Sequence, residues 1–340
     1  MSNVSRYIAL VRRPDGVPTR DDFELREQET PPPREGEAVV RNLHVSVDPY
    51  MRGRMRDVPS HMGPFPFGEP IAGAAVGRVE RSRNGSLPEG ATVVSFSGWR
   101  ERFITDGSDV EAFDAGDLPP PAFLGVLGTP GFTAWYGLSR IGLPKPGETV
   151  LVSAGAGAVG SLVVQLAKRA GCRVVAVVGS AEKARHVTDD LGADVALNRR
   201  DEADMTAAVR RSCAEGVDIY FENTGGATLE AALANVNEFA RMPVCGMIST
   251  YNEPTGAPGP PNLTQVIVKR VTMRGFLVRD HMALRGEFLA EVAPMVRDGA
   301  IHRRETIVEG LERAPDAFIG LFRGRNIGKM VVSLRSDGPR

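Results

Sequence analysis

The chain has 340 residues, 42% of them apolar, and its 41 basic and 42 acidic residues leave a formal net charge of −1. This length allows two domains with cores of ordinary size, and the composition is that of a globular rather than a disordered chain. The balanced charge excludes a general electrostatic attraction to nucleic acid or to an anionic membrane surface, so we expect neither as a partner.

Membrane and disulfide features are also missing from the sequence. No apolar run approaches the ~20 residues that span a bilayer, and the first residues, Met1 to Arg6, lack the pattern of a signal peptide. Three cysteines, Cys172, Cys213 and Cys245, are too few and too far apart for a disulfide scaffold or a CxxC metal site. We therefore expect a cytoplasmic protein with reduced thiols.

The first 125 residues contain β-type segments separated by proline and glycine turns, which predicts a mostly β domain. The expected strands are 6–11, 37–47, 71–79, 92–96 and 101–104. After about residue 304 the chain returns to β character at 306–308 and 330–334, around a short helix near 315–322. We expect this tail to rejoin the first domain.

A different pattern begins with a helix that opens after Thr129 and Pro130. From residue 149 onward strands and helices alternate, which predicts an α/β fold with a doubly wound parallel Rossmann sheet. Ligands of such sheets bind at the carboxyl ends of the strands. The expected strands are 150–152, 173–178, 195–197, 217–221 and 243–248, and the expected helices are 158–170, 181–191, 202–213 and 227–235.

A glycine-rich turn follows the first strand of this region. Its glycines have GxGxxG spacing, in which the first permits a tight turn, the second lets a pyrophosphate approach and the third lets the helix pack near the strand. A merely structural turn of small residues is the alternative. The candidate cofactor-binding residues of the turn are Gly155, Ala156, Gly157, Ala158, Val159 and Gly160.

The next strand indicates which dinucleotide binds. An NAD site usually has an acidic residue about 20 residues past the glycines, but here the strand ends in Gly179-Ser180. Lys183 follows, and the third strand ends at Asn198-Arg199-Arg200. These cations predict a pocket for a 2′-phosphate, and hence NADPH; the alternative is that they are solvated surface charges.

In the first domain, the segment Ser46 to Met55 leaves a strand and enters a loop that contains Tyr50 and Arg52. These two side chains could line a substrate cleft. The alternative is an Asp-Pro turn with solvated arginines.

Seven motifs together resemble the medium-chain dehydrogenase/reductase superfamily, and within it the zinc-free leukotriene B4 dehydrogenase/prostaglandin reductase group, which includes alkenal double-bond reductases and curcumin-reductase-like enzymes. The motifs are SVDPYMRG at 46–53, LGTPGFTAWYGL at 127–138, SAGAGAVGS at 153–161, VGSAEK at 178–183, FENTGG at 221–226, CGMISTYN at 245–252 and GRNIGK at 324–329. The resemblance implies a GroES-like catalytic domain over 1–126 and 304–340 and a Rossmann NADP-binding domain over 127–303. It also implies NADPH-dependent reduction of the C=C bond in α,β-unsaturated ketones or aldehydes, by hydride transfer to the β-carbon.

The resemblance also implies roles for single residues. Ser180, Lys183, Asn198 and Arg199 would lie at the 2′-phosphate, although the group often has tyrosine where this chain has Arg199. Asn326 would contact the nicotinamide end, and Asn223 would lie on a loop over the cofactor. The two residues that flank Asn223 are Glu222 and Thr224, whereas the group more commonly has Asp and Val at these positions. Tyr251 would lie beside the nicotinamide ribose and the substrate carbonyl. The family often forms homodimers through the cofactor domain, for which the apolar segments 266–271 and 273–278 are candidates, unless they are sheet core.

Zinc-dependent relatives have a Gly-His-Glu turn and cysteine ligands, whereas this chain has Gly68-Glu69-Pro70 and no cysteine cluster. We therefore expect no metal, and activation of the substrate by a hydrogen bond from the Tyr251 hydroxyl to the developing enolate. The alternative for Tyr251 is packing on the proline-rich segment 252–261. Substrate size would depend on the loops 53–67, 257–262 and 278–281.

Two rival functions remain open. One is quinone reduction with the same cofactor, and the other is a non-catalytic NADPH-binding protein, against which the near-zero charge and the retained Tyr251 and Asn326 argue.

Overall fold

The computed structural model describes residues 4–58, 62–254 and 256–334. Residues 1–3 of the amino-terminal segment and 59–61 of the loop 53–67, both considered above, lie outside the described residues. The chain forms two compact units, the first made of 1–124 and 305–340 and the second of 125–304. The domain boundaries expected from the sequence, after 126 and after 303, differ from these by two residues and by one.

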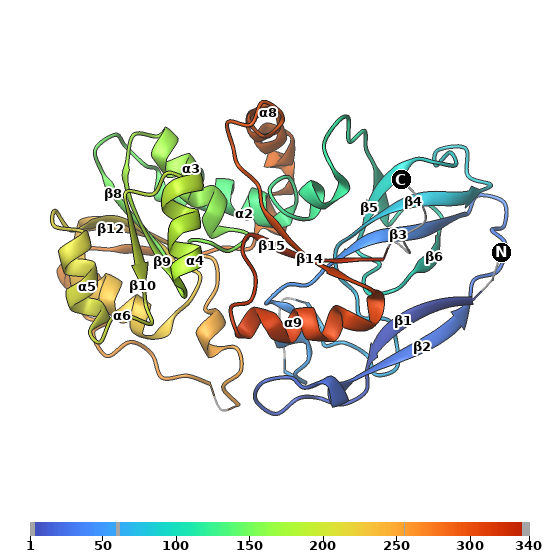
Figure 1. Ribbon diagram of the computed structural model, residues 1–340, viewed down its shortest axis with the longest axis horizontal. Helices are drawn as coiled ribbons and strands as arrows, with labels where there is room; N and C mark the ends of the chain where they lie inside the picture. Colours follow the sequence, from blue (N-terminus) through green and yellow to red (C-terminus); the bar gives the residue numbers. More distant parts are fainter. Residues whose placement is uncertain (1–3, 59–61, 255, 335–340) are drawn as a thin grey trace. The chain divides into compact units, whose positions relative to one another are not determined.

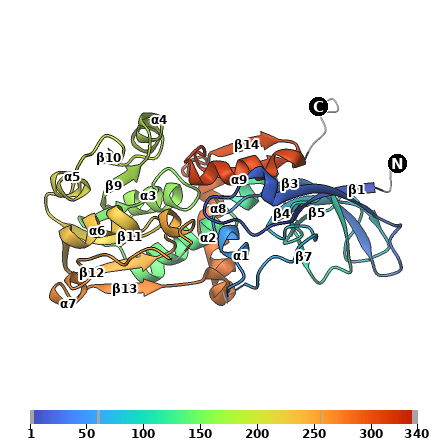
Figure 2. The ribbon, with the colours of Figure 1, turned by 90° about the horizontal axis from the view of Figure 1, so that it is seen from below.

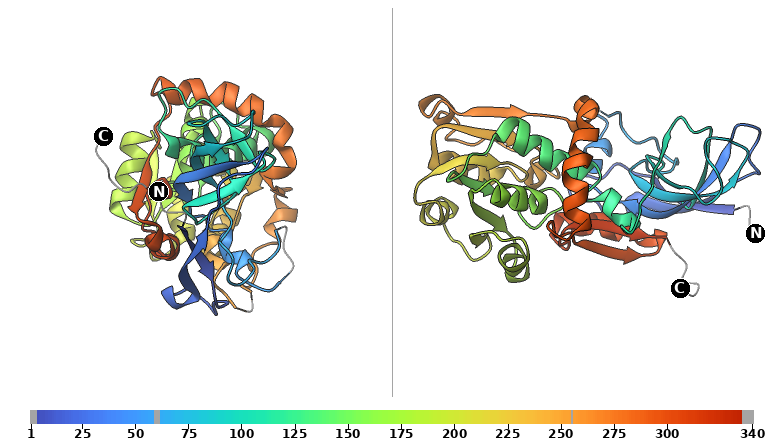
Figure 3. Two further views of the ribbon diagram at one scale, coloured as in Figure 1. Left: turned by 90° about the vertical axis from the view of Figure 1, so that its right-hand side faces the viewer. Right: turned by 90° about the horizontal axis from the view of Figure 1, so that it is seen from above.

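The second unit contains a parallel sheet of six strands in the order β10-β9-β8-β11-β12-β13. Numbered along the chain, this order is 3-2-1-4-5-6, that of the dinucleotide-binding Rossmann sheet. Strands β10 and β13 lie at opposite edges (Figures 2 and 3). The predicted fold class is thus confirmed. The strands are β8 (Thr149–Val152), β9 (Arg173–Val178), β10 (Val195–Asn198), β11 (Val217–Phe221), β12 (Val236–Val244) and β13 (Thr272–Gly275).

Helices connect these strands. The helix α3 illustrates why they form: Leu162, Val163 and Ala167 are buried on its apolar face, while Lys168 and Arg169 lie at its carboxyl end, where cations interact favourably with the helix dipole. The helices are α2 (Thr129–Tyr136), α3 (Gly160–Arg169), α4 (Ala181–Arg185), α5 (Met205–Ser212), α6 (Gly226–Asn235), α7 (Gln265–Val268) and α8 (Arg285–Arg297). Within the described ranges, no helix is both long and apolar enough to cross a bilayer.

One expected strand is wrong in its bounds. The sequence pattern placed a strand at 243–248, whereas β12 runs from Val236 to Val244. The last parallel bridge joins Val244 to Glu222, where the Cys245 N–H donates to the carbonyl oxygen of Glu222 at 2.9 Å. The Gly246 N–H then turns back to the same oxygen at 3.2 Å, and the ladder goes no further. This local exit from the sheet creates the loop that carries Tyr251.

The first unit is mostly β, as expected (Figure 1). A sheet of seven strands has the order β14-β15-β3-β4-β5-β7, with β6 paired to β3, and β1 and β2 form a separate antiparallel pair. Trp99, Phe318 and Met51 are buried in its main core. The elements are β1 (Val4–Leu10), β2 (Phe23–Glu29), β3 (Ala38–Ser46), β4 (Ala75–Ser82), β5 (Thr92–Ser95), β6 (Arg102–Thr105), β7 (Val110–Ala112), β14 (Glu305–Glu309), β15 (Lys329–Ser333), α1 (Met51–Arg54) and α9 (Ala314–Phe322).

Candidate active site

The glycine-rich turn joins β8 to α3 at the point where the strand order reverses. A Cβ atom on Gly160 would lie 2.3 Å from the carbonyl oxygen of Ala154, and one on Gly155 would lie 2.8 Å from the Cβ of Ala176. Both positions therefore require glycine. The residue before α3, Val159, makes no side-chain capping bond, and the N–H groups of Ser161 and Leu162 donate to the backbone carbonyl oxygens of Gly157 and Val159 at 2.9 and 3.1 Å. An uncapped helix start beside a close-approach turn fits a pyrophosphate.

Positive charge gathers at the ends of the next two strands. Ser180 caps α4, where its Oγ accepts a hydrogen bond from the N–H of Lys183 at 3.3 Å. Burial, and then the charges of Arg200 and Arg199, lower the pKa of Lys183. The Nε of Arg199 would lie 3.7 Å from a Cβ on Gly179, so this guanidinium lies over the end of β9.

The three cations Lys183, Arg199 and Arg200 would be stabilised better by a bound anion than by water alone. Lys183, Arg199 and Arg200 repel one another, and no carboxylate of a described residue forms an ion pair with them. A phosphate group would relieve both the repulsion and the desolvation of Lys183. Asn198 contributes to the shape of the turn, because its Nδ2 donates to Asp201 at 2.7 Å.

Asn223 lies on the loop that follows β11, across the switch point from the glycine turn. Its N–H donates to the Oγ of Ser153 at 2.8 Å, and its Nδ2 donates to the carbonyl oxygen of Ser153 at 2.8 Å. The end of β8 therefore fixes this side chain. Sequence reasoning missed Ser153 and the fully buried Glu222; polar residues directly after two central strands were the signal that could have identified them.

Tyr251 follows the 3₁₀ turn Ile248–Thr250 and is partly buried. Its hydroxyl accepts a hydrogen bond from the N–H of Met247 at 3.3 Å. Burial raises the pKa of this phenol, and Cys245 and Glu222 raise it further. Tyr251 is therefore a neutral phenol at physiological pH, the protonation state that a hydrogen-bond donor requires.

Tyr50 and Arg52, in the first unit, differ in their surroundings. The Tyr50 hydroxyl is buried and has no hydrogen-bond partner among the residues that the structure describes, and burial raises its pKa. The Arg52 side chain is 1% exposed, and its Nη2 donates to the carbonyl oxygens of Pro14 and Gly16 at 3.2 and 2.8 Å. Burial lowers the Arg52 pKa to about 10. Arg52 is therefore not a solvated arginine, and its carbonyl contacts hold the loop at Pro14 to Gly16.

Asn326 lies in the loop before β15, where its Nδ2 donates to the carbonyl oxygen of Gly328 at 2.9 Å. The next strand begins with Lys329, which is 4% exposed. The Nζ of Lys329 donates to Asp48 Oδ1 at 3.0 Å and to the carbonyl oxygens of Val47 and Met330 at 2.9 Å each. This lysine ties the end of the Asn326 loop to the segment that leads into Tyr50.

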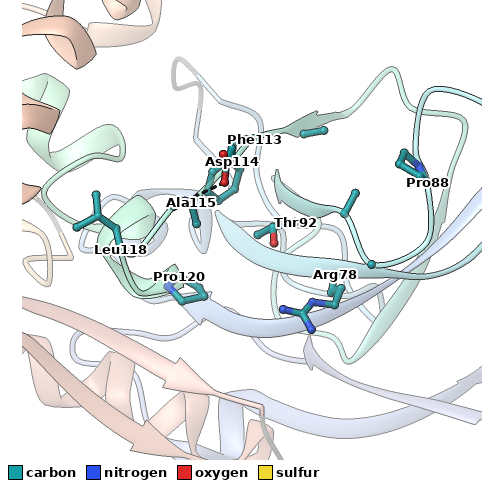
Figure 4. A pocket seen from close by; sticks show the side chains of 12 residues that line it. Arg78, Pro88, Thr92, Phe113, Asp114, Ala115, Leu118 and Pro120 are labelled. Carbon is teal, nitrogen blue, oxygen red and sulfur yellow. Dashed lines mark hydrogen bonds between the residues drawn. The ribbon is translucent and has the colours of Figure 1, made fainter.

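Two further features of the structure concern metals and cavities. Among residues 4–58, 62–254 and 256–334, no group of three or more His, Cys, Asp or Glu side chains could hold a metal ion. A pocket of about 680 Å³ lies on the first unit (Figure 4). None of the candidate site residues lines it; its walls include Arg78, Thr92, Phe113, Asp114, Leu118 and Pro120.

Comparison with known proteins is consistent with this architecture. Residues 6–113 match the family model described as N-terminal domain of oxidoreductase, and residues 158–294 match the one described as zinc-binding dehydrogenase. The NADPH-dependent curcumin reductase of Escherichia coli is 43% identical, with 98% of each chain covered. The 2-alkenal reductase (NADP(+)-dependent) of Nicotiana tabacum is 42% identical, again with 98% of each chain covered.

Among solved structures, CurA from Vibrio vulnificus in complex with NADPH matches with a TM-score of 0.93 and 41% identity, over 98% of this chain and all of that one. The likeness thus extends through both units of the fold. The chain therefore belongs to the medium-chain dehydrogenase/reductase family, as its motifs predicted, in the group that includes the curcumin and 2-alkenal reductases.

Proposed function

We propose that this protein is an NADPH-dependent oxidoreductase that reduces the C=C bond of α,β-unsaturated ketones and aldehydes by hydride transfer to the β-carbon. The observation that carries the choice of cofactor is the cation cluster of Lys183, Arg199 and Arg200, which follows the ends of β9 and β10. The two relatives with about 40% identity, a curcumin reductase and a 2-alkenal reductase, are named for NADPH or NADP(+) dependence, which supports the same cofactor here.

The residues that would hold the cofactor come from three regions. When bound, NADPH supplies the hydride. The turn from Gly155 to Gly160 would hold the pyrophosphate, and the residues that would hold the 2′-phosphate are Ser180, Lys183, Asn198 and Arg199. The nicotinamide end would be contacted by Asn223, Tyr251 and Asn326, as the family motifs imply.

Tyr251 has the chemistry that the reduction needs. Addition of hydride to the β-carbon of an enone places negative charge on the carbonyl oxygen, and a positioned donor stabilises that charge. The neutral Tyr251 hydroxyl, oriented by the N–H of Met247, donates a hydrogen bond to this oxygen. The α-carbon receives its proton from Tyr251 or from water.

On the first unit, Tyr50 belongs to the substrate cleft, because a buried hydroxyl without a partner is stabilised by a polar group of a ligand. Arg52 supports the same region through the carbonyl oxygens of Pro14 and Gly16.

A small substrate panel tests the function. Purified protein is mixed with NADPH and with an alkenal, a long-chain enone or a quinone, and the loss of NADPH absorbance is followed. Turnover of the alkenal or the enone is the expected result. Turnover of the quinone alone would replace the proposal with quinone reduction. Tight NADPH binding with no turnover of any compound would indicate a non-catalytic binding protein.

The variant Lys183→Ala tests the 2′-phosphate site. Because one charge-assisted hydrogen bond contributes roughly 1.5–3 kcal/mol, the Kd for NADPH should rise about tenfold or more while the Kd for NADH changes little. Both constants are measured by fluorescence titration. The control is Lys168→Ala, which removes a lysine that pairs with Asp194 at 2.8 Å in the same unit. Equal weakening of NADPH and NADH binding by Lys183→Ala would contradict the assignment.

We also propose a homodimer formed through the edge of the Rossmann sheet. Strand β13 is an edge strand (Figure 2), and the adjoining helix α7 exposes Ile267 at 79% and Val268 at 57%. An unpaired strand edge with apolar neighbours is a common site of association.

We propose a cytoplasmic location as well. The three cysteines are free thiols, which are typical of a reducing compartment such as the cytoplasm.

Ile267→Asp should convert the dimer to a monomer, because it places a charge in the apolar contact. Sedimentation velocity measures the change. Leu25→Asp, at a residue on β2 with 42% exposure, is the control and should leave the sedimentation coefficient unchanged. A wild-type chain that sediments as a monomer would refute the proposed dimer.

A further inference from the structure

Glu222 is a fully buried carboxyl group directly after the central strand β11. Three hydrogen-bond donors converge on its Oε1 atom: the Oγ of Ser153 at 3.1 Å, the N–H of Thr224 at 2.5 Å and the N–H of Gly225 at 2.9 Å. Burying a carboxyl group is costly unless it is hydrogen-bonded in this way. The side chain therefore acts as an internal acceptor that shapes the loop from 222 to 226.

The backbone of the same loop holds the segment that leads to Tyr251. The carbonyl oxygen of Glu222 accepts from Cys245 at 2.9 Å, that of Asn223 accepts from Ile248 at 3.1 Å, and that of Thr224 accepts from Ser249 at 2.9 Å. Three successive carbonyl groups thus accept hydrogen bonds from the loop after β12. The position of Tyr251 depends on this attachment.

Ser153 links Glu222 to Asn223. Its hydroxyl proton is shared between Glu222 Oε1 at 3.1 Å and the carbonyl oxygen of Phe221 at 3.2 Å, and its oxygen accepts from the N–H of Asn223 at 2.8 Å. The carboxyl group, the hydroxyl and the amide form one buried chain between the ends of β8 and β11. Such a chain fixes side chains only while every member keeps its partner.

We propose that Glu222 is a positioning residue of the reductase, which sets both Asn223 and the Tyr251 loop through Ser153 and through the backbone of 222–224. The proposal rests on the NADPH-dependent reduction proposed above. It gives a function to a buried acidic residue that neither contacts solvent nor forms an ion pair with a described residue.

Glu222→Ala tests this role, because it leaves three donors at the loop without their acceptor. The Kd for NADPH and the kcat for an enone are measured. The Kd should rise about tenfold or more and kcat should fall by a similar factor, since each unpaired buried donor is costly. Glu222→Gln keeps an acceptor oxygen at the same distance along the side chain and should restore both values to within about threefold of wild type.

The matched control lies at the other end of the same strand. Asp218 accepts hydrogen bonds from the N–H of Thr149 and from the Nδ2 of Asn237, each at 2.8 Å, so it also ties β11 to its neighbours. Asp218→Ala should lower the melting temperature, as Glu222→Ala does, but should leave Kd and kcat within about twofold of wild type. A merely structural role for Glu222 predicts instead that the two variants change Kd and kcat alike.

Ser153→Ala is the second variant, and it decides the question if Glu222→Ala does not fold. It removes only the hydroxyl between Glu222 and Asn223 and should raise the Kd for NADPH several-fold. In the Asn223→Ala background the same change should add little, because residues that act through one another are not additive. Unchanged Kd in Ser153→Ala, or full additivity with Asn223→Ala, would overturn the positioning role. A wild-type protein that does not bind NADPH would overturn the proposed function itself.

Discussion

Tyr251→Phe is expected to lower kcat for an enone by about 10²–10³-fold, the usual effect of removing one preorganised donor to an oxyanion. The phenylalanine ring keeps the packing of Tyr251 but has no proton for the developing enolate oxygen. Because the hydroxyl of Tyr251 is held by the N–H of Met247 and its pKa is raised by burial, the native donor is both oriented and protonated. Steady-state kinetics with saturating NADPH measures the loss.

The loss must be separated from a change in cofactor binding. The Kd of Tyr251→Phe for NADPH should remain within about threefold of wild type, because the variant removes one hydroxyl and leaves the phosphate contacts intact. Tyr7→Phe is the control, since it removes a tyrosine hydroxyl that is bonded to the backbone outside the candidate site: the Tyr7 hydroxyl donates to the carbonyl oxygen of Gly68 at 3.2 Å. An unchanged kcat in Tyr251→Phe would remove Tyr251 from the mechanism and favour a packing role.

Lys329→Met is expected to lower the free energy of unfolding by about 3–5 kcal/mol, because it leaves the Asp48 carboxylate without its cation in a mostly buried site. The side chains of Lys329 and Asp48 are only 4% and 16% exposed. The same lysine also satisfies the carbonyl oxygens of Val47 and Met330, which lose their donor in the variant. Urea-induced unfolding measures the change.

Two variants show whether burial causes this effect. Arg83→Met removes one partner of the exposed Arg83–Glu35 pair in the same unit and should cost less than about 1 kcal/mol. The double variant Lys329→Met/Asp48→Leu removes both charges and should recover most of the lost stability. A loss below about 1 kcal/mol in Lys329→Met would show that the pair contributes no more than a surface ion pair.

The sequence predicted the Rossmann sheet because its signals are local. At Gly157 and Gly160 an added Cβ would meet the Ala154 carbonyl oxygen of the same turn, at 3.1 and 2.3 Å, and the alternating strands and helices have distinct hydrophobic periods. The end of β12 was mispredicted, since the ladder stops at the bridge between Val244 and the distant Glu222, where the Gly246 N–H turns back to the Glu222 carbonyl group. No periodicity along 243–248 encodes that contact.

The burial of charged residues is the other feature that the local sequence pattern could not predict. Arg52, Glu222 and Lys329 are polar residues that would ordinarily be placed at the surface, yet they are 1%, 0% and 4% exposed. Each is buried because residues far away in the sequence provide its partners, such as Gly16 for Arg52 and Asp48 for Lys329. The sequence thus marks Ser153 and Glu222 only as polar residues at the ends of strands, and their hydrogen-bond partners become evident in the folded chain.

Deuterium tracing tests most directly that the protein reduces a C=C bond with hydride from NADPH. An enone is reduced with NADPH that carries deuterium at the transferable C4 position, and the product is analysed by NMR. The expected product is the saturated ketone with deuterium on the former β-carbon. Deuterium on the carbonyl carbon of an allylic alcohol, or a product without deuterium, would contradict double-bond reduction by hydride transfer.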